Sequence, residues 1–128
     1  CFSGKYTAGE VRKMLAGHGG LVAYTGSNDM RDLLKAAAEG DKEIAATVDA
    51  FHYQIGKEVG AMAAVMKGKV DQIILTGGIA YGQETVDAIT DMVGWIAPIT
   101  VYPGEDELLA LAQGALRVLN GEEPARVY

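Results

Sequence analysis

Cysteine, basic charge and long apolar runs are scarce in this sequence of 128 residues, and each scarcity excludes a class of protein. With Cys1 as the single cysteine, no intrachain disulfide can form, and the cytosol is the expected compartment. The sequence has 11 basic and 17 acidic residues, and the resulting net charge of −6 disfavours nucleic acids and anionic membranes as partners. The uncharged apolar run at 59–66 is far shorter than the roughly 20 residues of a membrane span.

The composition is otherwise that of an ordinary globular domain. Apolar residues make up 49% and charged residues 22%, and the chain is long enough for one domain with a core. Long alanine-rich helical patterns with few strands favour an α/β fold. The acidic balance does not exclude a nucleotide, because backbone N–H groups and a bound cation can hold phosphates. The chain begins at Cys1 and runs almost at once into a helical pattern, so we expect a piece of a longer protein rather than a lipidated first residue.

The most informative stretch of the sequence is residues 71–82. A near-continuous apolar run at 70–75 predicts a strand that is covered on both faces. Thr76, Gly77 and Gly78 follow, and two adjacent glycines permit positive φ and close approach of a ligand. Residues 83–93 then have the periodicity of a helix. The glycine turn therefore lies at the carboxyl end of a strand, where ligands bind in open α/β sheets.

Two well-known glycine loops do not match this turn. A dinucleotide fingerprint would need a second glycine where Ile79 stands. A P-loop would need Lys-Ser or Lys-Thr after Gly82, but Gln83 and Glu84 follow. The remaining alternatives are a different ligand-binding turn and a plain strand-to-helix turn that needs glycine for its shape.

Further elements are predicted on either side. Thr7 and Glu10 form a capping-box pattern at the start of a first helix. Residues 21–24 read as a short strand, and a helix should follow with Ser27 or Asn28 as its N-cap. A long helix is expected over 42–67, with His52 as a packing residue. Residues 99–102 predict a second, parallel strand, and the last helix should end near residue 119.

Three turns carry the candidate polar groups, at residues 27–31, 77–82 and 104–107. Acidic residues in the first turn of a helix are stabilising, which is a sufficient reason for Asp29 and for the acids at 105–107. Arg31 does not fit that explanation, because a cation is unfavourable at a helix start. Its position suggests a function.

Taken together and in order, several segments of the chain resemble the carboxyl-terminal third of butyrate kinases, in the acetokinase family. The matching segments are residues 1–6, 19–24, 27–31, 53–55, 68–71, 75–81 and 102–105 running into 110–115. The resemblance implies part of an actin-like, ribonuclease H-like ATPase lobe. It would contain a parallel βαβ unit with several packed helices and would lack the antiparallel strands of the complete lobe. Residues 1–128 would then be a single domain, the carboxyl-terminal nucleotide-binding lobe fragment of a longer kinase.

The implied reaction transfers the γ-phosphate of ATP, with Mg²⁺, to butyrate or a branched short-chain acid, giving an acyl phosphate and ADP. In phosphoryl transfer a protein mainly positions groups and offsets charge. The phosphate loops and the carboxylate pocket would lie outside this chain, so the isolated chain is expected to be inactive. The resemblance also implies pairing into a homo-oligomer. A stand-alone nucleotide-binding or regulatory module of the same fold is the alternative.

The resemblance assigns residues to the nucleotide. Asp29 would face the ribose and Arg31 the adenine, with Met30 between them, and the adenosine motif maps onto Thr76, Gly77, Gly78 and Ile79. Gly82 belongs to the same motif and stands where acetate kinases usually carry an asparagine. The acid on the Mg²⁺ side maps best onto Glu107, with Glu105 and Asp106 as alternatives.

Overall fold

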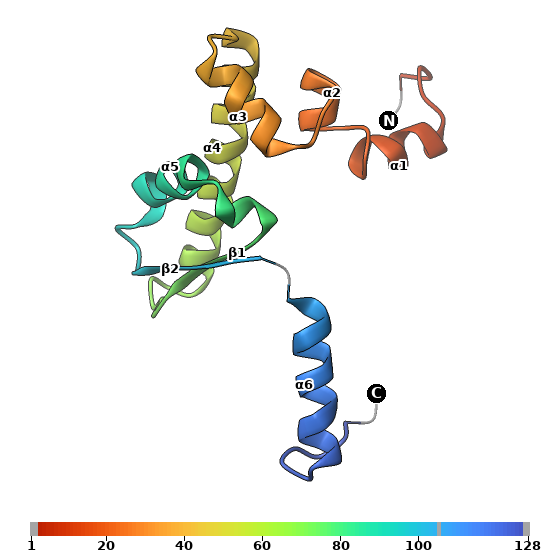
Figure 1. Ribbon diagram of the computed structural model, residues 1–128. Helices are drawn as coiled ribbons and strands as arrows, with labels where there is room; N and C mark the ends of the chain where they lie inside the picture. Colours follow the sequence, from red (N-terminus) through yellow and green to blue (C-terminus); the bar gives the residue numbers. More distant parts are fainter. Residues whose placement is uncertain (1–2, 105, 127–128) are drawn as a thin grey trace.

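The computed structural model describes residues 3–104 and 106–126 (Figure 1), so Cys1 and Glu105 lie outside the described residues. The elements follow one another along the chain as α1 (Ala8–Leu15), α2 (Leu21–Thr25), α3 (Met30–Ala38), α4 (Lys42–Val65), β1 (Ile73–Gly77), the 3₁₀ helix η1 (Gly78–Tyr81), α5 (Gln83–Val93), β2 (Ile99–Pro103) and α6 (Glu107–Leu119).

A strand–helix–strand unit forms the centre of the molecule. β1 and β2 pair in parallel, with Ile73 opposite Ile99 and Gly77 opposite Pro103. The chain between them passes through η1 and α5. The predicted parallel βαβ unit is thus confirmed, although β1 begins at Ile73 rather than near residue 70.

One face of this two-stranded sheet is covered. Ile73 packs with Ile89, Val93 and Ala97, and α4 adds Ile55 to the same cluster. The expectation that β1 is covered on both faces is wrong, because Ile74 is 60% exposed. Side chains alternate along a strand, so every second residue of β1 points to the uncovered face. An apolar run shows that a strand suits burial, but it does not show which neighbour supplies the cover.

The long helix α4 connects this unit to α3. A second cluster joins Met30 and Leu33 of α3 to Val48 of α4, with Phe51 packed against it. Asp41 caps α4 by accepting hydrogen bonds from the N–H groups of Glu43 and Ile44, both at 3.0 Å. α4 therefore carries α3 near its amino end and α5 with the sheet along its carboxyl half (Figure 1).

The predicted strand at residues 21–24 is wrong, because these residues belong to the short helix α2. The hydroxyl of Thr25 donates to the carbonyl of Leu21, at 2.8 Å, one helical turn earlier. Four apolar residues between glycines fit either a strand or a helical turn, and periodicity cannot separate the two at this length. Packing of Leu21 on the α3–α4 cluster favours the turn.

α6 extends away from the strands, as Figure 1 shows. Its leucines are largely exposed, including Leu108, Leu111 and Leu119. The whole chain has an accessible surface of 9967 Å². A compact folded monomer of 13.5 kDa has about 6,500 Å². Much apolar surface therefore remains uncovered. None of the helices in the described part of the chain is long and apolar enough to cross a membrane.

Candidate functional site

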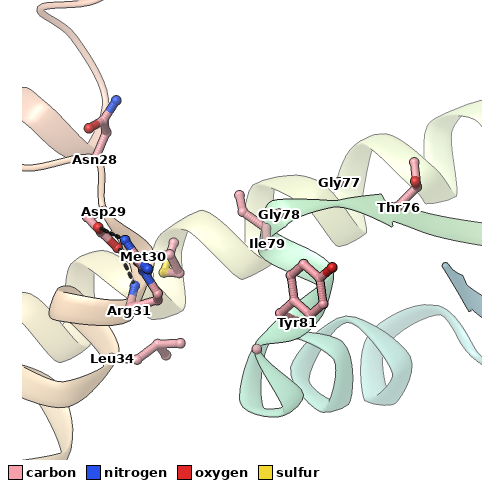
Figure 2. Close-up of a pocket in the computed structure, with 11 residues that line it drawn as sticks. Asn28, Asp29, Met30, Arg31, Leu34, Thr76, Gly77, Gly78, Ile79 and Tyr81 are labelled. Carbon is pink, nitrogen blue, oxygen red and sulfur yellow. Dashed lines mark hydrogen bonds and ion pairs between the residues drawn. The ribbon is translucent and has the colours of Figure 1, made fainter. Parts of the chain in front are cut away.

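A pocket of about 830 Å³ lies between the start of α3 and the carboxyl end of β1. Figure 2 shows its two walls, one from the α3 turn and one from β1 and η1. The lining residues are Asn28, Asp29, Met30, Arg31, Leu34, Thr76, Gly77, Gly78, Ile79, Tyr81 and Gly82. All of the residues predicted to bind nucleotide are among them, so two turns about 50 residues apart in sequence form one site. That they bind a nucleotide remains a prediction.

The first wall is built by the cap of α3. The N-cap is Asp29, not Ser27 or Asn28, because the Asp29 carboxylate accepts a hydrogen bond from the N–H of Arg31 at 3.0 Å. Ser27 instead accepts from the N–H of Asp29 at 3.1 Å and so shapes the preceding turn. Met30 anchors the wall, because its side chain is buried in the α3–α4 cluster.

Asp29 and Arg31 form an ion pair at the rim of this wall (Figure 2). The guanidinium Nη2 lies 2.6 Å from one carboxylate oxygen, and Nε lies 3.0 Å from the other. This hydrogen bonding lowers the pKa of Asp29 to about 2, so the carboxylate is ionised at neutral pH. The pair also explains how α3 tolerates a cation in its first turn, because Asp29 offsets the charge of Arg31.

The second wall is mostly bare backbone. Of the two adjacent glycines, Gly77 has the positive φ, +87°, which favours glycine. Its carbonyl accepts a hydrogen bond from the N–H of Gly104 at 3.1 Å, so the ends of β1 and β2 are joined at the pocket. Gly78 is the first residue of η1, which carries Ile79 and ends before Gly82. The absence of side chains at both glycines leaves room for a ligand beside the strand end.

The two walls approach each other at Gly82. A Cβ added to Gly82 would lie 3.7 Å from Cδ1 of Leu34, a residue of α3. Gly82 also precedes α5, and its carbonyl accepts from the N–H of Val86 at 3.1 Å. A small residue at this position therefore lets α3 pack close to the start of α5.

Glu107 does not join this pocket. It is the first residue of α6, and it lines a separate hollow of that helix together with Ala110, Leu111, Gly114 and Ala115. Among the described residues, no three His, Cys, Asp or Glu side chains are grouped so that they could hold a metal ion. Mg²⁺ commonly takes only one or two protein carboxylates beside substrate phosphates, so a single acid here is compatible with that ion. The metal assignment of Glu107 stays a prediction.

Three lining residues were not in the predicted site. Asn28 and Leu34 are neighbours of the predicted α3 turn, and Tyr81 ends η1. Asn28 lay within the predicted turn at 27–31, of which only residues 29–31 were assigned to the nucleotide. Tyr81 likewise lay within the turn at 77–82, although no role was assigned to it. Leu34 gave no sequence signal for a site, because an apolar helix residue is common in any fold.

A comparison with protein families matches residues 3–116 to the model described as the acetokinase family. The chain belongs to the acetokinase family. Curated relatives agree: "Probable butyrate kinase" of Clostridium botulinum (strain Alaska E43 / Type E3) and "Butyrate kinase 2" of Clostridium acetobutylicum (strain ATCC 824) are each 56% identical over all 128 residues. The chain spans 36% of the length of each of these acetokinase relatives.

Solved structures show the same fold. An acetate kinase of Porphyromonas gingivalis matches with a TM-score of 0.76 at 21% identity, over 89% of this chain and 35% of that one. A propionate kinase of Francisella tularensis subsp. tularensis SCHU S4 matches with a TM-score of 0.71 at 22% identity, over 84% and 33%. The expected α/β lobe of the acetokinase family is therefore confirmed.

Proposed function

We propose that this chain is the adenosine-binding part of a short-chain carboxylate kinase, which transfers the γ-phosphate of ATP to butyrate or a branched short-chain acid. The observation that carries the proposal is the single pocket formed by the Asp29–Arg31 turn and the Thr76–Gly82 turn. Relatives named butyrate kinase, at 56% identity over the whole chain, support the choice of acid.

The pocket fits a nucleoside in size and chemistry. Its volume lies within the range of about 300–1,000 Å³ that is usual for small-molecule sites. In this proposal the ionised Asp29 accepts hydrogen bonds from ribose hydroxyls, and Arg31 lies along the adenine. The bare backbone at Gly77 and Gly78 lets the adenosine pass close to the strand end. Bound Mg²⁺ would offset phosphate charge, and Glu107 is the residue of this chain assigned to that side.

Compartment and assembly are part of the same proposal. A cytoplasmic location is proposed because the sequence has a single cysteine and no possible intrachain disulfide. Homo-oligomer formation is proposed because β1 and β2 form a sheet of only two strands among the described residues, and open strand edges promote association.

A stand-alone nucleotide-binding or regulatory module remains the second candidate. The same pocket supports it, because binding adenosine requires only the two turns, whereas phosphoryl transfer also requires groups that position the acid and the phosphates.

Two measurements on the full-length natural polypeptide that carries this sequence separate these functions. Mg-ADP should raise the melting temperature, because a ligand that binds the folded state stabilises it. ATP and butyrate together should yield acyl phosphate, trapped with hydroxylamine as a hydroxamate. Stabilisation by Mg-ADP without hydroxamate would favour the regulatory module. If neither stabilisation nor hydroxamate is observed, the remaining interpretation is a small interaction domain whose glycine turns serve only the fold.

A further inference from the structure

Tyr81 is an exposed aromatic residue on the wall of the pocket. It ends η1, is 71% exposed, and lines the pocket beside Ile79 and Gly82. Figure 2 shows its ring on the wall opposite Asp29 and Arg31. Among the described residues that line the pocket, it provides the aromatic surface. An exposed aromatic ring beside bare glycine backbone is an apolar, planar surface available to a ligand.

The hydroxyl end of Tyr81 lies close to the turn after β2. A Cβ added to Gly104 would lie 2.9 Å from the Tyr81 hydroxyl oxygen, 3.7 Å from Cζ and 4.0 Å from Cε2. Gly104 is itself fixed, because its N–H donates to the carbonyl of Gly77 at 3.1 Å. The hydroxyl end of the ring therefore lies close to the turn that follows β2, while the side chain as a whole stays exposed.

From this arrangement we propose that Tyr81 is a nucleoside-binding residue, whose ring forms the wall opposite the Asp29–Arg31 turn. The inference rests on the proposed nucleotide-binding function. Bases stack favourably on aromatic side chains, largely regardless of base identity.

Binding of adenosine and of ADP, measured by calorimetry on the full-length natural polypeptide, tests this role. Tyr81→Ala should weaken both ligands by a similar factor, about five- to hundredfold, as expected for loss of one stacking contact. Tyr81→Phe keeps the ring and should stay within about threefold of the unmodified protein. Tyr53→Ala is the matched control, because Tyr53 is exposed on α4 and does not line this pocket.

A second pair of variants tests whether the position of the Tyr81 hydroxyl beside Gly104 matters for binding. A methyl group in Gly104→Ala would crowd the Tyr81 hydroxyl at 2.9 Å and displace the ring. In a Tyr81→Phe background the nearest ring atom is at 3.7 Å, an ordinary contact. Gly104→Ala should therefore weaken adenosine binding more in the presence of the hydroxyl than without it. The strain of φ +112° at Gly104 affects stability in both backgrounds and cancels in this comparison.

The outcomes separate this inference from the proposed function. If the unmodified protein binds ADP and Tyr81→Ala binds both ligands equally well, Tyr81 does not contact the nucleoside, and the inference is wrong while the nucleotide site stands. If Tyr81→Ala weakens ADP but leaves adenosine unchanged, the contact is to phosphate and the inference is also wrong. If the unmodified protein binds neither ligand, the proposed function falls, and the inference falls with it.

Discussion

The imidazole Nε2 of His52 lies 3.0 Å from the hydroxyl oxygen of Thr85, and the two side chains form a buried polar link between α4 and α5. His52 is 6% exposed and Thr85 1%. Thr85 stands in the first turn of α5, three residues after Gly82 of the pocket. The link therefore holds the start of α5, and with it one pocket wall, on the helix that also carries α3. It confirms the expectation that His52 is a packing residue.

Loss of this hydrogen bond should destabilise the fold. In Thr85→Val the shape of the side chain is kept but His52 loses its buried partner, so the free energy of unfolding should fall by about 1–3 kcal/mol. Urea unfolding measures the change. Thr47→Val is a matched control, because the partner of the Thr47 hydroxyl among the described residues is the carbonyl of Glu43 within the same helix. Its effect should stay within about 0.5 kcal/mol. Equal effects of the two substitutions would show that the link contributes nothing specific.

The same histidine should make stability depend on pH. Burial lowers the pKa of His52 below its ordinary value of 6.5, and the nearby Asp49 partly opposes this shift. The unfolded chain then binds a proton on this histidine more readily than the folded chain does. The contribution of His52 to the free energy of unfolding is therefore complete above pH 6.5 and is lost as the pH falls towards the pKa of the folded state. His52→Gln should flatten the decline in melting temperature below pH 6.5. His18→Gln, which changes an exposed histidine, should not, and a decline that survives in His52→Gln would contradict the assignment.

The fold could be predicted from the sequence where the structure of a helix or strand depends on its own residues alone. The capping box of Thr7 and Glu10 is present, with the Thr7 N–H donating to the Glu10 carboxylate at 2.7 Å. The periodicity of α4 and α5 was equally readable. The sequence failed at α2 and at the open face of β1, because both depend on neighbours: Leu21 packs on another helix, and Ile74 has no covering element among the described residues. A short apolar run does not show which other element will pack against it.

The predicted site combined local chemistry with a resemblance. The glycine turn is visible as a local pattern, since Gly77 needs a positive φ. That the α3 turn lies across the same pocket is a long-range relationship, which the family resemblance supplied and the structure shows. Tyr81 lay within the glycine turn but was assigned no role, because its exposed place on the pocket wall, with its hydroxyl close to Gly104, depends on a residue 23 positions further along the chain.

Asp29 should act in nucleotide affinity rather than in the chemical step. A carboxylate near phosphates would repel them, whereas one that faces the ribose makes the same contact before and during phosphoryl transfer. In the full-length protein, Asp29→Ala should raise the KM for ATP about tenfold or more, with a smaller fall in kcat. Asp29→Asn keeps a good N-cap and separates loss of the cap from loss of charge. A large fall in kcat at constant KM would place Asp29 in the chemical step instead.

Gly78 should not accept a branched side chain without loss of affinity. It begins η1 on the pocket wall, so Gly78→Val would place methyl groups where the adenosine is proposed to pass. Overpacking of this kind costs about 1–3 kcal/mol, which corresponds to a rise of about 5- to 150-fold in the Kd for Mg-ADP. Gly60→Val is the control, because a Cβ at Gly60 would meet open space. Unchanged affinity in a folded Gly78→Val protein would mean that the glycine pair only shapes the turn.

A polypeptide of residues 1–128 alone should fold but not catalyse. The cluster around Ile73 and the α3–α4 cluster around Met30 give it a core. Its accessible surface is 9967 Å², against about 6,500 Å² for a compact chain of this mass, and this excess predicts weak stability and self-association. The chain offers the proposed adenosine contacts and an acid for the Mg²⁺ side, for which Glu107 is the first candidate and Glu105 and Asp106 are the alternatives. It has no P-loop motif.

Positioning of the acid and the phosphates would then be lost, and effective molarities for well-oriented groups reach about 10⁵–10⁸ M. Hydroxamate formation from ATP and butyrate should therefore fall by many powers of ten relative to the full-length protein, while Mg-ADP binding persists weakly. Circular dichroism of the same sample establishes that the fragment is folded, so that inactivity is not mistaken for unfolding. Turnover within about a hundredfold of the full-length protein would place the catalytic groups on this chain, and the division of the active site proposed above would be wrong.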